Sequence, residues 1–247
     1  MQTAPLQPTC NRHYESVLSM KHRLILPGVF ALVLLFAACS PPPPLRDDSL
    51  LQDTGLITQD TSCSAPCWRG ITPGQSKWSD ALTILEDDKT LENVTPQNDT
   101  ESKSSVAQFQ QKGGTTCCQM YTDDGENVSV IFLRVAPKMT LSQVLVAQGE
   151  PTYVVGSEYS DDQAVMNLIY PEKSLVVYAF VAGKTTGALS ATSEIVGVLY
   201  MRPTDMDLLV KTSSLHAWQG YKSYSAYDTS TYEVTPSITL TPTPNGG

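Results

Sequence analysis

The stretch VAPKMTLSQVLVAQG, residues 135–149, decides the fold because it contains a complete helix with both of its ends. Thr140 is a good N-cap, and Gln143 stands three residues later, where it completes a capping box. Apolar residues follow on one face, and Gly149 ends the helix. We therefore expect a short amphipathic helix here.

A similar phrase stands earlier in the chain, at residues 71–87 (ITPGQSKWSDALTILED). Ser76 is the expected N-cap, and Trp78 begins an apolar stripe at positions i, i+3, i+4 and i+7. This periodicity predicts another amphipathic helix that ends near Asp87, with Trp78 in the core.

Strand-like runs follow each of these helices, which is the pattern of an α+β fold. The order of one helix and then several strands occurs twice. We interpret it as a duplicated unit of one helix followed by a three- to four-stranded antiparallel sheet, at 63–135 and at 136–225. The alternative is a single α+β domain whose two helix phrases agree by chance. The expected strands are 106–110, 115–121 and 128–135, then 153–155, 164–170, 175–181 and 195–201.

The N-terminal region has the features of a secretory signal. The basic stretch Met20-Lys21-His22-Arg23 precedes an apolar run at 24–38, and two alanines precede Cys39. The run is also short for a transmembrane helix, which needs about 20 residues. We expect residues 1–38 to be a signal peptide, with translation starting at Met20.

Ala37-Ala38-Cys39 resembles the lipobox of bacterial lipoproteins, in which the cysteine is acylated and becomes the new N-terminus. Phe36 departs from the usual aliphatic residue at the first lipobox position. The resemblance implies a lipid anchor on Cys39, so that the protein faces outside the cytoplasm at the cell membrane or the outer membrane. A plain signal peptide with a chance cysteine, or an uncleaved signal anchor, is the alternative.

Polar segments flank the expected folded part. Four prolines at 41–44 favour polyproline II, and we expect residues 39–62 to form a lipidated, semi-rigid stalk. Residues 226–247 are rich in Thr, Ser and Pro. They have too little apolar surface to offset their ordering entropy, so we expect a disordered tail.

Acidic residues outnumber basic ones. The formal net charge of the 247 residues is −9. Removal of residues 1–38 takes away three basic residues and one acidic residue, and leaves 13 basic against 24 acidic residues, or −11. This balance repels phosphate backbones, and no basic patch interleaved with aromatics offsets it. We expect no nucleic acid among the partners.

Four cysteines besides the anchor are disulfide candidates, because thiols oxidise outside the cytoplasm. Cys63 and Cys67 stand in a proline-containing loop, where a local bridge would staple the entry to the first helix. Cys117 and Cys118 are neighbours on an expected strand and so face opposite sides, which makes their mutual pairing strained. Cross-pairing between the two sets is the alternative. The spacing fits neither the usual zinc pairs nor a thioredoxin-like pair, and we expect no metal.

The sequence offers no set of residues that indicates catalysis. His216 is the one histidine of the mature part, and no Gly-x-Ser-x-Gly elbow occurs. The stretch Asp123-Asp124-Gly125-Glu126-Asn127 could coordinate calcium, but it lacks the EF-hand pattern, and hairpin turns favour the same residues. We expect a turn there, and neither a cofactor nor a catalytic residue.

Two tryptophans are the candidates for surface-binding aromatics. Trp68 and Trp218 each stand next to a glycine-containing turn, where an exposed indole could contact a sugar or a partner peptide. Packing in the core is the favoured interpretation for both.

Residues 63–74, CSAPCWRGITPG, resemble the opening of a group of uncharacterised lipoproteins from Chloroflexi-type bacteria. That group carries the phrase Pro-Cys-Trp-aromatic-Gly-Ile-x-Pro-Gly after a lipobox, and here Arg69 replaces the second aromatic. The resemblance extends loosely to the later strands and to 218–221. It implies no activity.

Residues 139–144 with Gly149-Glu150-Pro151 are similar to the phrase that opens small envelope lipoproteins of the SmpA/OmlA kind. A duplicated relative of that layout occurs in the inhibitory protein of β-lactamases. Both bind other proteins, so the resemblance implies another envelope protein as a partner, besides the membrane that the lipid anchor would contact.

These observations predict a membrane-anchored extracytoplasmic lipoprotein with a non-enzymatic module that binds a protein or another ligand. The alternative is an envelope hydrolase or a carbohydrate-binding accessory protein. A purely structural spacer is a third reading.

Overall fold

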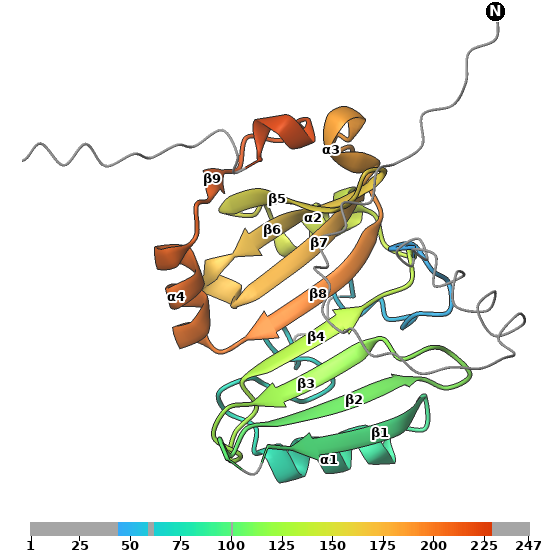
Figure 1. Ribbon diagram of the computed structural model, residues 1–247, viewed down its shortest axis with the longest axis vertical. Helices are drawn as coiled ribbons and strands as arrows, with labels where there is room; N and C mark the ends of the chain where they lie inside the picture. Colours follow the sequence, from blue (N-terminus) through green and yellow to red (C-terminus); the bar gives the residue numbers. More distant parts are fainter. Residues whose placement is uncertain (1–43, 59–61, 100, 229–247) are drawn as a thin grey trace, which may run out of the picture. The chain divides into compact units, whose positions relative to one another are not determined.

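The computed structural model describes residues 44–58, 62–99 and 101–228 (Figure 1). The expected signal peptide at 1–38, the anchor Cys39 and the tail from residue 229 onward lie outside these ranges. Within the described residues, no helix reaches the length and apolar character that crossing a bilayer requires.

Nine strands in the described residues form one antiparallel sheet, in the order β1-β2-β3-β4-β8-β7-β6-β5-β9. Seven of the strands were expected from their apolar residues; the ends of β7 and β8 match the expectation, and those of the other five are shifted. β1 was missed because it is polar and contains proline. The strands are β1 (Leu91–Asn98), β2 (Ser105–Gln111), β3 (Cys118–Thr122), β4 (Val130–Arg134), β5 (Tyr153–Ser160), β6 (Gln163–Tyr170), β7 (Leu175–Val181), β8 (Ile195–Met201) and β9 (His216–Ala217).

The pairing of β4 with β8 makes the sheet continuous. Val130 pairs with Met201, and Arg134 with Gly197. Separate sheets would each have had an edge of unpaired N–H and C=O groups at this position, and the β4–β8 pairing satisfies both edges. The mixed α and β class is therefore confirmed. The duplicated unit of a helix with its own sheet, expected at 63–135 and 136–225, is wrong, because the protein is mostly one large sheet.

The helices in the described residues are α1 (Trp78–Asp87), α2 (Leu141–Gln148), α3 (Gly183–Thr186) and α4 (Pro203–Thr212), with the 3-10 turns η1 (Pro171–Lys173) and η2 (Tyr224–Ala226). α2 begins as expected, with Gln143 accepting a hydrogen bond from the Thr140 N–H at 2.9 Å. The N-cap of α1 is Lys77 rather than Ser76. The Ser76 hydroxyl instead accepts the Thr72 N–H at 2.9 Å, in the turn before the helix.

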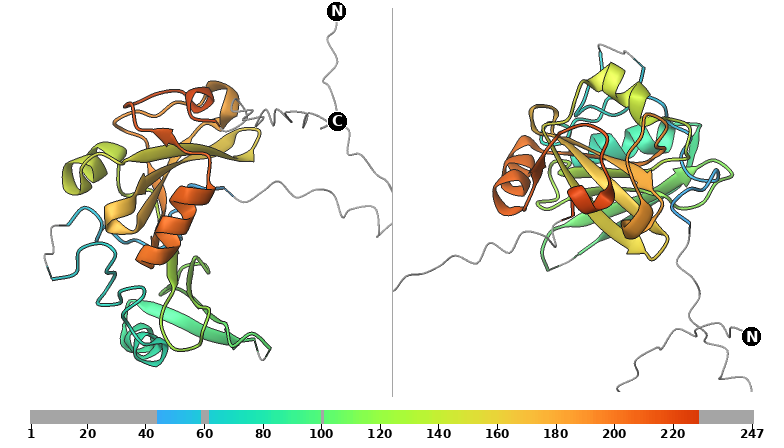
Figure 2. Two further views of the ribbon diagram at one scale, coloured as in Figure 1. Left: turned by 90° about the vertical axis from the view of Figure 1, so that its left-hand side faces the viewer. Right: turned by 90° about the horizontal axis from the view of Figure 1, so that it is seen from above.

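The sheet has a large core on one face and a small core on the other. α1 and α2 pack on the first face, where Leu85 and Leu141 join the large core (Figure 2). α4 covers part of the second face through Met206. Neighbouring residues of β6 show the alternation, since Leu168 belongs to the large core and Ile169 to the small one.

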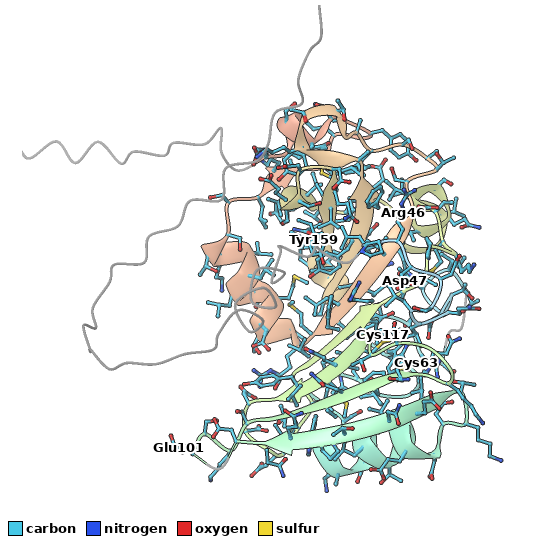
Figure 3. All side chains as sticks on the ribbon, turned by 45° about the vertical axis from the view of Figure 1, so that its right-hand side comes forward. Arg46, Asp47, Cys63, Glu101, Cys117 and Tyr159 are labelled. Carbon is cyan, nitrogen blue, oxygen red and sulfur yellow. A yellow bond between two sulfur atoms is a disulfide. The ribbon has the colours of Figure 1, made fainter. Side chains whose placement is uncertain are left out.

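Residues 44–58 pack against the sheet, although the sequence placed most of them in a stalk. Leu50 and Leu51 are each 1% exposed. The N–H of Leu51 donates to the carbonyl of Arg134, the last residue of β4, at 3.3 Å. Arg46, labelled in Figure 3, lies 4.5 Å from the centre of the Phe180 ring. This segment therefore forms one wall of the folded part.

Candidate functional site

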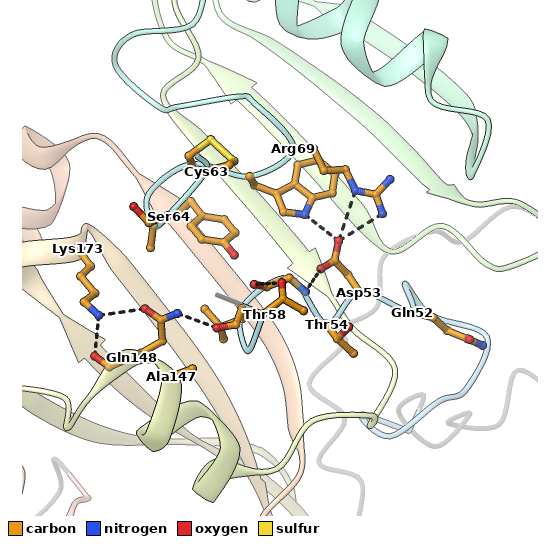
Figure 4. A pocket seen from close by; sticks show the side chains of 16 residues that line it. Gln52, Asp53, Thr54, Thr58, Cys63, Ser64, Arg69, Ala147, Gln148 and Lys173 are labelled. Carbon is orange, nitrogen blue, oxygen red and sulfur yellow. Dashed lines mark hydrogen bonds and ion pairs between the residues drawn. A yellow bond between two sulfur atoms is a disulfide. The ribbon is translucent and has the colours of Figure 1, made fainter. Parts of the chain in front are cut away.

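A cavity of about 600 Å³ opens where the segment before α1 meets the end of α2 and the β7–β8 pair (Figure 4). Its polar lining includes Asp53, Arg69 and Lys173, and its apolar lining includes Leu56 and Ala147. These residues come from parts of the chain that are far apart in sequence. The cavity thus depends on the packing of residues 44–58 described above.

Asp53 is the centre of one wall. Its Oδ2 accepts hydrogen bonds from Trp68 Nε1 at 3.0 Å and from Arg69 Nε at 3.4 Å, and it forms an ion pair with the Arg69 guanidinium. Its Oδ1 accepts the Gly55 N–H at 2.7 Å. Both oxygens of the carboxylate are therefore occupied, and the three donors hold the wall in one arrangement (Figure 4).

Arg69 extends this network away from the cavity. Its guanidinium forms an ion pair with Asp88 and donates to the Thr90 hydroxyl at 2.8 Å. Burial by itself would raise the pKa of Asp88, but the hydrogen bonds from Thr90 and the charge of Arg69 outweigh it and lower the pKa below its usual value. The positive charge of Arg69 is thus shared by two carboxylates.

Lys173 stands at the opposite side of the cavity. Its Nζ donates to the Gln148 carbonyl at 2.6 Å and to Gln148 Oε1 at 3.1 Å. The side-chain nitrogen of Gln148 donates in turn to the Leu56 carbonyl at 2.7 Å. Among the described residues, no carboxylate forms an ion pair with this half-buried ammonium group. The side chain therefore brings an unneutralised positive charge to the cavity.

Tyr200 contributes a hydroxyl to the lining. The residue is 4% exposed, and its hydroxyl has no hydrogen-bond partner within 44–58, 62–99 and 101–228. Burial raises the pKa of this phenol, and the nearby Asp53 charge raises it further. The phenol therefore stays protonated and can donate a hydrogen bond to a ligand.

The four cysteines form two disulfides, and Figure 3 labels one cysteine of each. The Cys63–Cys67 bridge is the expected one, and both residues line the cavity. Cys117 pairs with its neighbour Cys118, so the alternative of cross-pairing with Cys63 or Cys67 does not occur. The expectation placed both cysteines inside one strand, whereas β3 begins only at Cys118. With their sulfurs paired, these cysteines are not zinc-binding thiolates.

The two candidate aromatics lie in different places. Trp68 is 4% exposed and stacks on Phe109 with ring centres 5.7 Å apart, so it belongs to the core although it also lines the cavity. Trp68 is therefore packed in the core, and the Asp53 carboxylate satisfies its N–H inside the protein. Trp218 is half-buried and stacks on Tyr227, away from the cavity lining.

The remaining candidates also lie outside the cavity. His216 is in β9, its Nε2 lies 3.3 Å from the Asp228 carbonyl, and its ring contacts Tyr227 edge-on. Asp124 accepts the backbone N–H groups of Glu126 and Asn127 within the expected hairpin turn. These backbone hydrogen bonds lower the pKa of Asp124 to about 2. The turn itself therefore uses this carboxylate.

Sequence reasoning missed the groups that define the cavity. Asp53 was placed in the stalk, Lys173 was treated only as part of a turn, and Tyr200 was one residue of a strand. The available signal was the apolar pair of Leu50 and Leu51, which is unusual in a solvated spacer. No family model, curated protein or solved structure matches this chain.

Proposed function

We propose that this protein is an extracytoplasmic lipoprotein, anchored through Cys39, whose folded part binds a small ligand in the cavity beside Tyr200. The observation that carries the binding role is that one cavity contains both the ammonium group of Lys173, which has no carboxylate partner in the described residues, and the Tyr200 hydroxyl, which has no hydrogen-bond partner there. The sequence features of residues 20–39 support the anchor and the location.

The size and the walls of the cavity support this role. A volume of about 600 Å³ lies within the range of small-molecule sites, which is roughly 300–1,000 Å³. The Cys63–Cys67 bridge and the Asp53 network restrain the wall, so a ligand would not have to order it. Binding rather than turnover is proposed, because His216, the one mature histidine, does not line the cavity.

A pair of substitutions on α2 tests the binding role. Ala147 lines the cavity, so Ala147→Trp should fill part of it, whereas the neighbouring Val146 is 84% exposed and outside this lining. The full chain in a non-ionic detergent would be screened by ligand-observed NMR against sugars, amino acids, nucleosides and aromatic acids and amides. Compounds that bind the wild type should also bind Val146→Trp but not Ala147→Trp. The proposal fails when no compound binds or when Ala147→Trp leaves binding unchanged.

The anchor has its own test. The intact mass of the full chain, extracted from membranes after expression in a bacterium, should correspond to a chain that starts at Cys39 and bears two or three acyl groups. Cys39→Ala should prevent acylation and release the protein from the membrane fraction. A chain that starts at Met1 or Met20 and has no lipid would contradict the anchor while leaving the cavity untouched.

A further inference from the structure

The acceptor atoms of Asp53 and Gln148, two residues that line the cavity, already take part in hydrogen bonds. Both oxygens of Asp53 accept hydrogen bonds, and Gln148 Oε1 accepts one from Lys173. An ammonium group has three donors, and Lys173 uses two of them on Gln148. Two donors of the lining remain beside Gln148, the third N–H of Lys173 and the Tyr200 hydroxyl, and neither donates to another described residue. A ligand that accepts hydrogen bonds therefore fits this end.

The two donors come from adjacent positions of the sheet. Tyr200 of β8 lies opposite Leu175 of β7, and Lys173 precedes Leu175 by two residues. The Met201 N–H donates to the Ser174 carbonyl at 3.1 Å, which fixes the turn that presents Lys173 against the end of β8. Both donors therefore belong to the same cavity.

The charges of the lining favour an anion in spite of the acidic composition of the chain. The lining has the cations Arg69 and Lys173 against the single carboxylate of Asp53. Arg69 is shared by Asp53 and Asp88, so Lys173 is the cation of the lining that has no carboxylate partner among the described residues. Acidic groups elsewhere on the surface act weakly, because at physiological ionic strength charges are screened over about 8 Å. One remaining positive charge suits a monoanion.

We propose that the cavity binds a small organic carboxylate, whose oxygens accept hydrogen bonds from Lys173 Nζ and the Tyr200 hydroxyl. The apolar part of the ligand lies against Leu56, Ala65 and Ala147, which line the same cavity. This assignment rests on the proposed function and adds the chemical class of the ligand.

A neutral ligand of the same shape isolates the contribution of the charge. Benzoate and benzamide would be titrated by calorimetry into the full chain in non-ionic detergent, in a chloride buffer at pH 7. Benzoate should bind at least about tenfold more tightly than benzamide, since hydrogen bonds to a charged group are the strong ones. Equal affinities, or no binding of benzoate, would overturn the carboxylate assignment.

Lys173→Gln removes the charge but keeps a donor for the Gln148 carbonyl. It should abolish the preference for benzoate over benzamide. Lys211→Gln, a change of the same charge on the exposed end of α4, should preserve that preference. Tyr200→Phe should weaken the binding of benzoate by about tenfold, and the binding of benzamide by less. A Lys173→Gln protein that discriminates as well as Lys211→Gln would contradict the proposal.

Ala147→Trp separates failure of this inference from failure of the proposed function. Suppose that benzoate and benzamide bind the wild type equally well and that neither binds Ala147→Trp. This result would support the cavity as a binding site and refute its preference for carboxylates. Absence of binding by every compound of the larger screen would refute the binding role itself.

Discussion

Two tyrosines allow the same substitution to be made with different expected effects on stability. Tyr200 is 4% exposed and its hydroxyl has no partner in the described residues. Tyr227 is 1% exposed, and its hydroxyl accepts the Gln219 N–H at 2.9 Å and donates to the Gly220 carbonyl at 3.0 Å. A Tyr→Phe change removes one oxygen at each site, so only the hydrogen bonding differs.

The magnitudes follow from those contacts. Tyr227→Phe loses two hydrogen bonds of about 0.5–1.5 kcal/mol each, and should lower the free energy of unfolding by about 1–2 kcal/mol, because Gln219 and Gly220 can partly rehydrate. Tyr200→Phe loses no hydrogen bond within the described residues, and its hydroxyl lies at the cavity, so the free energy of unfolding should change by less than about 0.5 kcal/mol.

Urea unfolding of the full-length variants measures the difference in unfolding free energy between them. A shift of the urea midpoint with an unchanged m-value, the slope of the free energy against urea concentration, reports a change in stability. Thermal unfolding should separate the two variants by roughly 2–8 °C, since 1 kcal/mol corresponds to about 2–4 °C in a domain of this size. If Tyr200→Phe destabilised the protein as much as Tyr227→Phe, the Tyr200 hydroxyl would have a partner, and the reasoning about the cavity's free donors would be refuted.

Three further outcomes are expected. Asp53→Ala should lower the free energy of unfolding in urea by about 2–4 kcal/mol, because it leaves the Trp68 N–H and Arg69 without their shared acceptor. The control Asp48→Ala removes the 75%-exposed partner of Lys138 and should cost under about 1 kcal/mol. Similar costs for the two variants would contradict the role of the Asp53 wall. The folded-state pKa of Asp124 is about 2, below its ordinary value of 3.8, so the stabilisation that it provides is present above about pH 4 and is lost as pH falls toward 2. Asp124→Ala should flatten this part of the stability curve, measured as urea midpoints from pH 5 to 2; an unchanged curve would argue against the backbone hydrogen bonds as the cause. Replacing both Cys63 and Cys67 by serine should cost about 2 kcal/mol from chain entropy and weaken benzoate binding, and calorimetry showing full affinity would mean that the bridge does not shape the cavity.

Local patterns in the sequence located most of the elements of the fold. The capping box at Thr140 and the glycine at 149 placed α2 almost to the residue, because both signals act within one turn of a helix. α4 could also have been found, since Pro203 starts it and Met206, Leu209 and Val210 have helical spacing. The pairing of β4 with β8 could not be predicted, because no local signal determines which distant strands meet.

The site was harder to predict than the fold, because no local signal in the sequence determines which distant segments meet. Asp53, Lys173 and Tyr200 belong to three segments, and none of them forms a motif within its own segment. Leu50 and Leu51 look like two apolar residues in a polar spacer until the edge beside β4 is known. Their burial brings Asp53 to Trp68 and Arg69, and that packing creates the cavity.

Lys173 has a structural explanation that competes with the binding proposal. Its ammonium group donates to the carbonyl of Gln148, the last residue of α2, and a cation at a helix C-terminus is favourable by itself. This role requires a donor near the helix end, and a glutamine amide can supply one. Preference for benzoate over benzamide requires a positive charge facing the cavity, which the amide lacks. Lys173→Gln should therefore retain most of the stability and lose the preference, whereas a purely structural lysine would show the reverse.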